Sequence, residues 1–445
     1  MAKSLWAKDL PLDLQLHSFT VGQDPITDLQ LMPFDTEGSA AHARMLGETG
    51  LLPEAEARAL VGALAQLRQE ALQGLIPILP EEEDCHTALE HALTERLGET
   101  GRRIHLARSR NDQVATAFRL LMRTRVLDLG QAVHACAAAF LDLARRERDT
   151  PLPGYTHMRR AMPASWGMWA AAYAEGLLEE LEALPALWDR LDRCPLGAAA
   201  GFGSPIPLDR ARSAQLLGFS RVQGSPMDVM NSRGRYEQAM AAWVVSASGT
   251  LEKALWDLAL YSTEEFGFLR LPDAFTTGSS LMPQKRNPDV VELARARCRE
   301  LRGLAGLIGQ LASGLPSSYH RDHQLLKAPF LETMAKGQEL FQVFAHLLPG
   351  LEILKAGCEA ACTQELHAAK EACRLAAAGM PFRDAYLEVA HQIQQGTFHP
   401  DPSPALGDLG LDATGAALAA SAEWLSGRRD LIQRTTEYLF AWGTK

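Results

Sequence analysis

Five long stretches rich in Leu and Ala run through the middle of this chain, while Val and Ile are few. Leu and Ala favour helices, and the β-branched residues typical of strands are scarce. No convincing alternation of apolar and polar residues is present, which also argues against strands. The sequence therefore predicts an all-α protein. We expect long helices over about 111–149, 163–193 with a kink at Pro185, 235–265, 288–311 and 329–355.

These expected helices are long and apolar over much of their circumference. A helix of about 30 residues is roughly 45 Å long, more than a small compact domain needs. The segments 137–141 and 166–173 leave little polar face. A helix that is apolar on all sides must be buried, and one bundle cannot bury every face of five such rods. We therefore expect bundles from several copies of the chain to pack together. The alternative is a monomer with modest exposed apolar patches.

The chain has 445 residues, enough for a large core and for two or three domains. We expect an N-terminal helical domain over 1–107 and a central domain of long helices over 108–356. The remaining residues, 357–445, are expected to form a small C-terminal helical domain of shorter helices and loops.

Charge and cysteine content exclude several classes of protein. The net charge of −10 argues against a nucleic-acid partner, which would favour a basic face. We find no apolar run of membrane-spanning length and no apolar core of a signal peptide. Seven cysteines without a Cys-x-x-Cys pair indicate reduced thiols in a cytoplasm. Cys358 and Cys362, four residues apart, are interpreted as core packing and not as metal ligands.

The segment 278–288, Gly-Ser-Ser-Leu-Met-Pro-Gln-Lys-Arg-Asn-Pro, combines groups that suit carbanion chemistry. Its flexible Gly-Ser-Ser run can place the hydroxyl of Ser279 over a substrate. Lys285 and Asn287 offer a positive charge and an amide for a carboxylate, and Pro288 fits the first turn of a helix. The pattern indicates proton abstraction next to a carboxylate. A polar linker before a helix is the alternative.

Two further segments each lie where a loop meets a long helix. In 105–113, Arg110 offers a planar fork for a carboxylate and Asn111 a mixed donor and acceptor, both at a helix start that favours anions. A helix cap with solvated arginines is the alternative. In 153–163, Thr156 and His157 put a hydroxyl next to an imidazole that suits a general acid. A structural histidine is the alternative.

The segment 314–327 contributes Tyr319, Gln324 and Lys327, which suit a carboxylate or an amino-acid head, although an ordinary turn between helices is the alternative. None of the four segments has metal-ligand spacing, a phosphate loop or a dinucleotide fingerprint. All four lie at ends of long helices, so they can converge at bundle ends, from one subunit or several. The segments together supply three cations, Arg110, Lys285 and Lys327. A local group of cations in an acidic protein suits a small polyanionic substrate.

Taken jointly, these segments resemble the fumarase/aspartase superfamily and, within it, the argininosuccinate lyase family, whose eye-lens relative is delta-crystallin. The motif 278–288 carries the superfamily resemblance, and 107–113 and 154–157 carry the closer one. The run 83–86 is similar to the family's Glu-Asp-x-His, and 38–43 to its N-terminal helix motif.

The resemblance implies a fold of three helical domains with a central five-helix bundle. It also implies a homotetramer with a 20-helix core, in which each active site draws on three subunits. The implied reaction is the reversible cleavage of argininosuccinate to arginine and fumarate, without metal or cofactor.

By motif position, the resemblance implies that Ser279 removes a proton from the succinyl group while Lys285 and Asn287 stabilise the carboxylate as its charge grows. His157 would protonate the leaving nitrogen, paired with Glu292. The further implied substrate-binding residues are Ser109, Arg110, Asn111, Thr156, Tyr319, Gln324 and Lys327, with His86 as a neighbour of the site.

Departures from the family pattern affect the amino-acid end of the pocket. Arg159 and Met162 replace two glutamines, and 228–234 reads Asp-Val-Met-Asn-Ser-Arg-Gly in place of Asp-Ala-Val-Ser-Asp-Arg-Asp. Two alternatives therefore stay open. One is a related lyase releasing fumarate from another N-substituted aspartate, and the other is a non-catalytic, crystallin-like structural protein.

Overall fold

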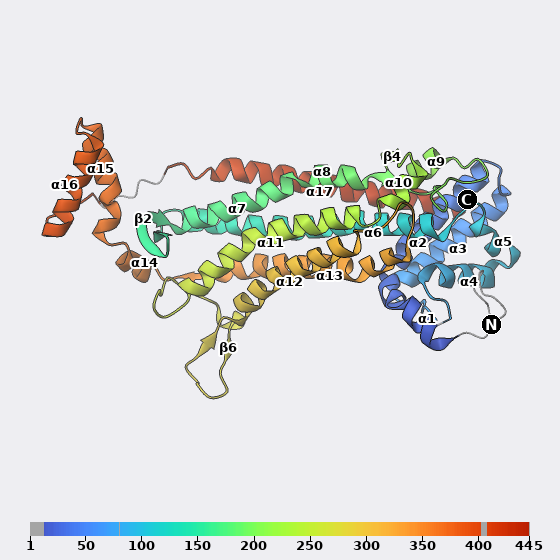
Figure 1. The fold of residues 1–445 in the computed structure, drawn as a ribbon, viewed down its shortest axis with the longest axis horizontal. Helices are drawn as coiled ribbons and strands as arrows, with labels where there is room; N and C mark the ends of the chain where they lie inside the picture. Colours follow the sequence, from blue (N-terminus) through green and yellow to red (C-terminus); the bar gives the residue numbers. More distant parts are fainter. Residues whose placement is uncertain (1–12, 80, 402–406, 445) are drawn as a thin grey trace.

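Long helices run side by side along the middle of the molecule, with groups of shorter helices at both ends (Figure 1). The computed structural model describes residues 13–79, 81–401 and 407–444. The all-α prediction is confirmed, and the five predicted rods are present. They are α6 (Arg110–Arg146), α7 (Trp166–Glu182) continued by α8 (Leu184–Leu191), α11 (Arg235–Tyr261), α12 (Asp289–Leu311) and α13 (Lys327–Leu347).

The second rod differs from its prediction at its start. Residues 159–165 form a strand, so α7 begins at Trp166 and not at Pro163. Ser165 caps this start, because its Oγ accepts a hydrogen bond from the backbone N–H of Met168 at 3.0 Å. The rod is interrupted after Glu182, next to Pro185, where the sequence predicted a kink.

Short strands, which the sequence analysis did not predict, pair into two-stranded sheets at the helix ends. The antiparallel pairs are β1 (Pro151–Thr156) with β2 (Arg159–Ser165), β5 (Leu269–Arg270) with β8 (Glu352–Ile353), and β6 (Thr277–Gly278) with β7 (Arg286–Asn287). A parallel pair joins β3 (Arg193–Cys194) and β4 (Arg221–Val222). Two of these hairpins, β1–β2 and β6–β7, carry predicted functional motifs.

The N-terminal helices surround the start of α6. They are α1 (Leu14–Val21), α2 (Asp24–Glu48), α3 (Glu54–Leu72), α4 (Cys85–Leu97) and α5 (Glu99–Arg102). Helix α2 is buried over most of its length and packs on both α3 and α6. The connection between α8 and α11 returns to the same end of the bundle through α9 (Arg210–Leu216) and α10 (Pro226–Asn231).

The prediction of shorter helices and loops after residue 357 is wrong for the last part of the chain. The helices there are α14 (Lys355–Ala361), α15 (Ala368–Ala377), α16 (Phe382–Gln395) and α17 (Leu411–Phe440). Helix α17 has 30 residues and runs back along α6 and α7, where Leu418, Leu425 and Leu439 enter the main core. We therefore propose that α17 belongs with the central bundle and that only the preceding helices form a separate C-terminal unit.

Helix α6 is the centre of this arrangement, because it packs against α2, α7, α13 and α17. Within the described residues it is also the single helix that is long and apolar enough to cross a membrane. In the most apolar 18-residue stretch of α6, 67% is buried inside the protein. The apolar composition of α6 is therefore that of a core helix.

Candidate active site

A pocket lies where the start of α6 meets α2, the loop before α4 and the start of α13. Six of the predicted site residues line it together: His86, Arg110, Asn111, Tyr319, Gln324 and Lys327. The fold thus brings the motifs 83–86, 105–113 and 314–327 to one end of the bundle. We call this region the head pocket.

Ser109 lies beside the head pocket but acts as the N-cap of α6. Its Oγ accepts a hydrogen bond from Asn111 N at 3.3 Å, and Asp112 Oδ1 accepts one from Ser109 N at 3.0 Å. Together they form a capping box. The other oxygen of Asp112 accepts hydrogen bonds from the backbone of Gly197 and Ala199, at 3.0 and 2.9 Å. The first turn of α6, which carries Arg110 and Asn111, is therefore held in place from both sides.

Arg110 reaches from this first turn to the loop before α4. Its Nη1 lies 2.8 Å from Asp84 Oδ2 and 3.8 Å from Glu83 Oε2, and its Nη2 donates to Thr87 Oγ1 at 2.7 Å. Asp84 in turn caps α4 by accepting from Thr87 N at 2.9 Å. The guanidinium is oriented by these contacts, and its charge is partly compensated.

Lys327 is buried between two acids of α2. Its Nζ lies 2.6 Å from Asp28 Oδ1 and 2.8 Å from Asp24 Oδ1. Burial alone would lower the pKa of Lys327, but the two carboxylates outweigh it and raise that pKa. Burial raises the pKa of Asp24 to about 6, against the attraction of Lys327. The head pocket therefore presents a charged ammonium next to acidic groups, a pattern that suits a zwitterion better than a simple anion.

Two predicted residues close the side of the head pocket. Gln324 Nε2 donates to the carbonyl oxygens of Thr20 and Val21, both at 2.9 Å, and so ties this wall to the end of α1. Tyr319 is half-buried and packs on the small apolar cluster that contains Val229 and Met230. Both side chains are held in place by contacts within the chain.

His86 forms a fully buried ion pair behind the head pocket. Its Nδ1 lies 2.9 Å from Asp35 Oδ2, and Gln113 Nε2 donates to both Asp35 oxygens at 3.0 Å. Burial lowers the pKa of His86, but the attraction of Asp35 outweighs it and the pKa is raised. Burial likewise raises the pKa of Asp35, and the attraction of His86 and Arg108 lowers it overall. Asp35 therefore keeps the His86 imidazole charged.

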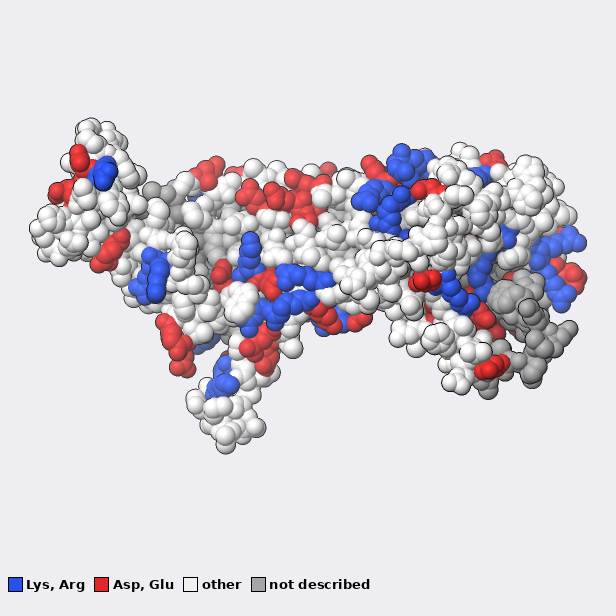
Figure 2. Space-filling view, in the orientation of Figure 1, with Lys and Arg blue, Asp and Glu red and all other residues white. Residues whose placement is uncertain are grey.

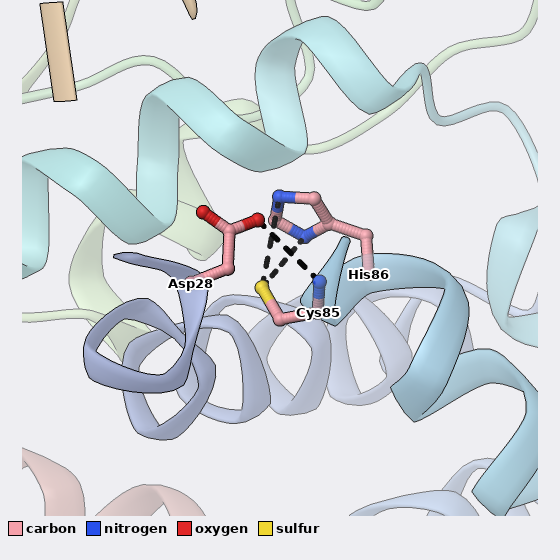
Figure 3. A group of neighbouring side chains, drawn as sticks. All are labelled: Asp28, Cys85 and His86. Atoms are coloured by element: carbon pink, nitrogen blue, oxygen red, sulfur yellow. Dashed lines mark hydrogen bonds between the residues drawn. The ribbon is translucent and has the colours of Figure 1, made fainter. Parts of the chain in front are cut away.

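Asp28, Cys85 and His86 are the residues that come closest to a metal-ligand cluster in the described part of the chain, with one potential ligand atom each within 4.8 Å of the others (Figure 3). Two of these groups already have another partner. Asp28 binds Lys327, and His86 binds Asp35. The Cys85 sulfur lies 3.8 and 3.9 Å from the two ring nitrogens, so it is directed at neither lone pair. The donor geometry is that of side-chain packing, and we assign no metal to it.

The Asp35–His86 pair predicts a pH-dependent effect of the Asp35→Asn substitution. Because the pKa of His86 is raised, the pair's stabilisation is fully present below about pH 6.5 and is lost as the pH rises through the folded-state pKa of His86. Because the pKa of Asp35 is lowered, the same stabilisation is lost only in acid, as the pH falls through the folded-state pKa of Asp35. We expect Asp35→Asn to cost about 3–5 kcal/mol of unfolding free energy near pH 6 and less near pH 9.

Urea unfolding at these two pH values measures the effect. The exposed Asp142 of α6 provides the control, because Asp142→Asn should change the unfolding free energy by less than about 0.5 kcal/mol. Titration of the His86 ring by NMR gives its folded-state pKa, and an equal cost of Asp35→Asn on the two sides of that pKa would show that the two groups are not linked by charge.

The β1–β2 hairpin presents Thr156 and His157 at the end of the bundle opposite the head pocket (Figure 1). The two turn residues, His157 and Met158, have φ values of 52° and 59°, a left-handed conformation that favours Gly or Asn. Thr156, His157 and Met158 are exposed. Strained non-glycine turns of this kind cluster at functional sites, so the conformation supports a functional interpretation of His157.

The β6–β7 hairpin projects from the side of the bundle and carries Ser279 and Lys285 in its loop and Asn287 in β7 (Figure 1). Figure 2 shows basic atoms on this hairpin and an uncharged tip. The Oγ of Ser279 accepts hydrogen bonds from the backbone N–H groups of Leu281 at 3.3 Å and Met282 at 3.1 Å. These two donors are suited to stabilise a serine alkoxide, which an unperturbed hydroxyl needs before it can act as a base.

Glu292 lies in the first turn of α12, directly after this hairpin. Its described ion-pair partner is Arg295, at 3.8 Å, and its side chain is 54% exposed. No described contact within this chain joins Glu292 to His157. Within one chain, the predicted site residues therefore lie in three separate places: the head pocket, the β1–β2 turn, and the β6–β7 hairpin with the first turn of α12 that follows it.

The residues of the head pocket that the sequence analysis missed as site residues include Asp24, Asp28 and Arg233. The two acids lie in a helix without a functional motif, so no local signal marks them. Arg233 lies within the run 228–234, which the sequence analysis treated only as a departure from a family pattern.

Comparisons with known proteins test the family resemblance suggested by the sequence. Residues 19–303 match the profile of a family described as Lyase. A protein of Sorangium cellulosum named argininosuccinate lyase is 43% identical over 395 residues, which are 88% of this chain and 91% of that protein. A protein of Thermotoga neapolitana with the same name is 38% identical over 88% of this chain and 98% of its own length.

Solved structures share the fold at lower identity. EDDS lyase in complex with formate matches with a TM-score of 0.79 and 22% identity, covering 98% of this chain and 96% of that one. A fumarate lyase:delta crystallin from Brucella melitensis bound to cobalt matches with a TM-score of 0.74 and 18% identity, covering 98% of both chains.

The helical fold and the profile match define the class: this protein is a lyase of the fumarase/aspartase superfamily. At identities of 38–43% over nearly nine-tenths of its length, the chain belongs to the argininosuccinate lyase family.

Proposed function

We propose that this protein catalyses the reversible cleavage of argininosuccinate to arginine and fumarate, the last step of arginine biosynthesis, in the cytoplasm. The names of the relatives support this substrate. The mixture of acids and cations in the head pocket suits the zwitterionic head of an amino acid. All seven cysteines are free thiols, in agreement with a reducing compartment.

The observation that carries the proposal is the division of the site residues among three separate places in one chain. Each place lacks what the others supply. The head pocket lacks the hydroxyl of Ser279, the proposed base, while the two hairpins lie apart from the pocket and present exposed functional groups (Figure 1). We propose that three copies of the chain complete each active site within a homotetramer.

The surface of α12 supports this assembly. Leu293 is 71% exposed and borders an open groove shared with α13. Gly303, Gly306 and Gly309 follow at three-residue spacing, and a Cβ at any of them would meet nothing within 4 Å. An uncovered face of this kind permits close approach of a second helix. Four five-helix bundles joined through such faces would form a core of 20 helices.

In the proposed reaction, Ser279 removes a proton from the succinyl β-carbon, the methylene carbon next to the one that carries the nitrogen. This β-carbon is itself attached to a carboxylate. The electron pair left on that carbon is delocalised into the carboxylate, where Lys285 and Asn287 stabilise the added charge. The carbon–nitrogen bond then breaks, the double bond of fumarate forms, and the pair from the broken bond goes to the guanidino nitrogen. His157 of a second copy delivers the proton to that nitrogen, with Glu292 of another copy paired with the imidazole.

The direct test is to incubate the purified protein with argininosuccinate and to follow fumarate by its ultraviolet absorbance. We expect fumarate to appear together with an equal amount of arginine. The departures at Arg159 and Met162 make other N-substituted aspartates the right comparison substrates. Fumarate from one of these but none from argininosuccinate would overturn the substrate. No fumarate from any of them would favour a structural, crystallin-like role.

A further inference from the structure

Arg233 lines the head pocket and has no use in the reaction proposed above. The residue is 8% exposed, and its Nε and Nη1 are buried without a hydrogen-bond partner. Among the residues the structure describes, no hydrogen bond or ion pair involves its guanidinium. Buried guanidinium donors are rarely left unsatisfied, because their desolvation is costly.

The backbone around Arg233 is held tightly. Ser232 is fully buried, donates to Val229 O at 3.0 Å and accepts from Gln223 Nε2 at 3.0 Å. Gly234 has a φ of 85°, and a Cβ there would lie 2.4 Å from that of Ala312. The guanidinium is therefore presented from a rigid segment between α10 and α11, and its place at the pocket wall is set by the fold.

The other cations of the head pocket already have acidic partners. Arg110 contacts Asp84, Lys327 contacts Asp24 and Asp28, and Arg321 lies 4.0 Å from Glu83. Glu237 lies one turn beyond Arg233 and is fully buried, yet within the described residues no ion pair joins the two. Glu237 attracts Arg233 electrostatically, but Arg233 is the cation of this pocket whose guanidinium takes part in no ion pair or hydrogen bond among the described residues.

We propose that Arg233 binds the α-carboxylate of the amino-acid leaving group, and so selects adducts whose departing amine carries a carboxylate. This inference rests on the proposed function and names the chemical class of its leaving group. A guanidinium fork and a carboxylate form two parallel hydrogen bonds, which would satisfy the buried donors of Arg233. The succinyl end has its own cation, Lys285, on the β6–β7 hairpin, so the head pocket is left for the amino-acid end.

The test compares L-arginine with agmatine, which is arginine without its carboxylate, by calorimetric titration of the full protein. Arg233→Gln should raise the Kd of L-arginine about 100-fold and change the Kd of agmatine by less than about twofold. Arg233→Lys keeps the charge without the fork, so the Kd of L-arginine should rise about tenfold. In parallel, kcat/KM for argininosuccinate should fall about 100-fold in Arg233→Gln.

Arg235→Gln is the matched control. It removes the same charge two residues away, where Arg235 pairs with Asp228 at 3.0 Å outside the pocket, and it should leave both Kd values unchanged. Equal losses for L-arginine and agmatine in Arg233→Gln, or no loss for either, would overturn the assignment. If that variant does not fold, an unchanged L-arginine Kd in Arg233→Lys would overturn it as well. Failure of the wild-type protein to cleave argininosuccinate would instead refute the proposed function.

Discussion

Replacing Ser279 by Ala is expected to lower the turnover of argininosuccinate about 1,000-fold or more, because the variant lacks the group that removes the substrate proton. L-arginine should bind as before, since the head pocket contains no part of the β6–β7 hairpin. The two backbone donors at Leu281 and Met282 make this serine suited to act as a base, since they can stabilise the alkoxide. Steady-state kinetics on fumarate release, with calorimetry on L-arginine, measures both quantities.

Ser280 offers the matched control for this prediction. Its hydroxyl is exposed on the same loop, and no described hydrogen bond involves it. Ser280→Ala should therefore keep turnover within about threefold of the wild-type value. Near-normal turnover in Ser279→Ala would show that another group is the base, and the proposed mechanism would then have to be abandoned.

Mixing two inactive variants should restore activity. Ser279→Ala and His157→Gln remove groups that lie in separate parts of one chain, so a site built from several copies can combine an intact hairpin with an intact β1–β2 turn. After subunits are exchanged at equal amounts, about a quarter of the sites should hold both intact groups, since each comes from a random copy. Activity should rise from below about 1% to about 25% of the wild-type value.

A second pair of variants controls this experiment. Ser279→Ala and Lys285→Ala both alter the β6–β7 hairpin, so no mixed assembly has an intact hairpin and activity should stay near zero. Recovery in this control pair would show that the hairpin residues come from different copies. No recovery with Ser279→Ala and His157→Gln, despite proven subunit exchange, would show that one copy supplies both groups.

The long helices were predictable because their signal is local. In 111–149, an unbroken Leu- and Ala-rich run, the cap at Ser109 and the absence of Pro all favour the same structure, and α6 follows closely. Helix α17 was missed although its composition is equally helical, because its 30 residues follow Pro-rich loop segments that suggested a small unit. We assign α17 to the bundle because it contacts α6, nearly 300 residues earlier in the chain.

The residues of the candidate site also fall into those that the local sequence predicted and those that it did not. Motif residues such as Ser279 and Lys327 were found from their neighbours in the sequence. Asp24 and Arg233 were not, because nothing near them marks a pocket until the chain has folded. Ser109 shows the opposite case, since its motif position implied substrate binding while the structure also uses its hydroxyl to cap α6.

From the sequence alone came the helical class, the long rods and the residue types of the chemistry, because helix propensity and motif spacing act over a few neighbouring residues. Only the tertiary structure decided which of these residues share a pocket and which stand apart. Lys327 is buried next to Asp24 and Asp28, and Arg233 is buried without a hydrogen-bond partner. Both environments depend on contacts between segments that are far apart in the sequence. Those contacts set the desolvation and charge that determine what each group can bind.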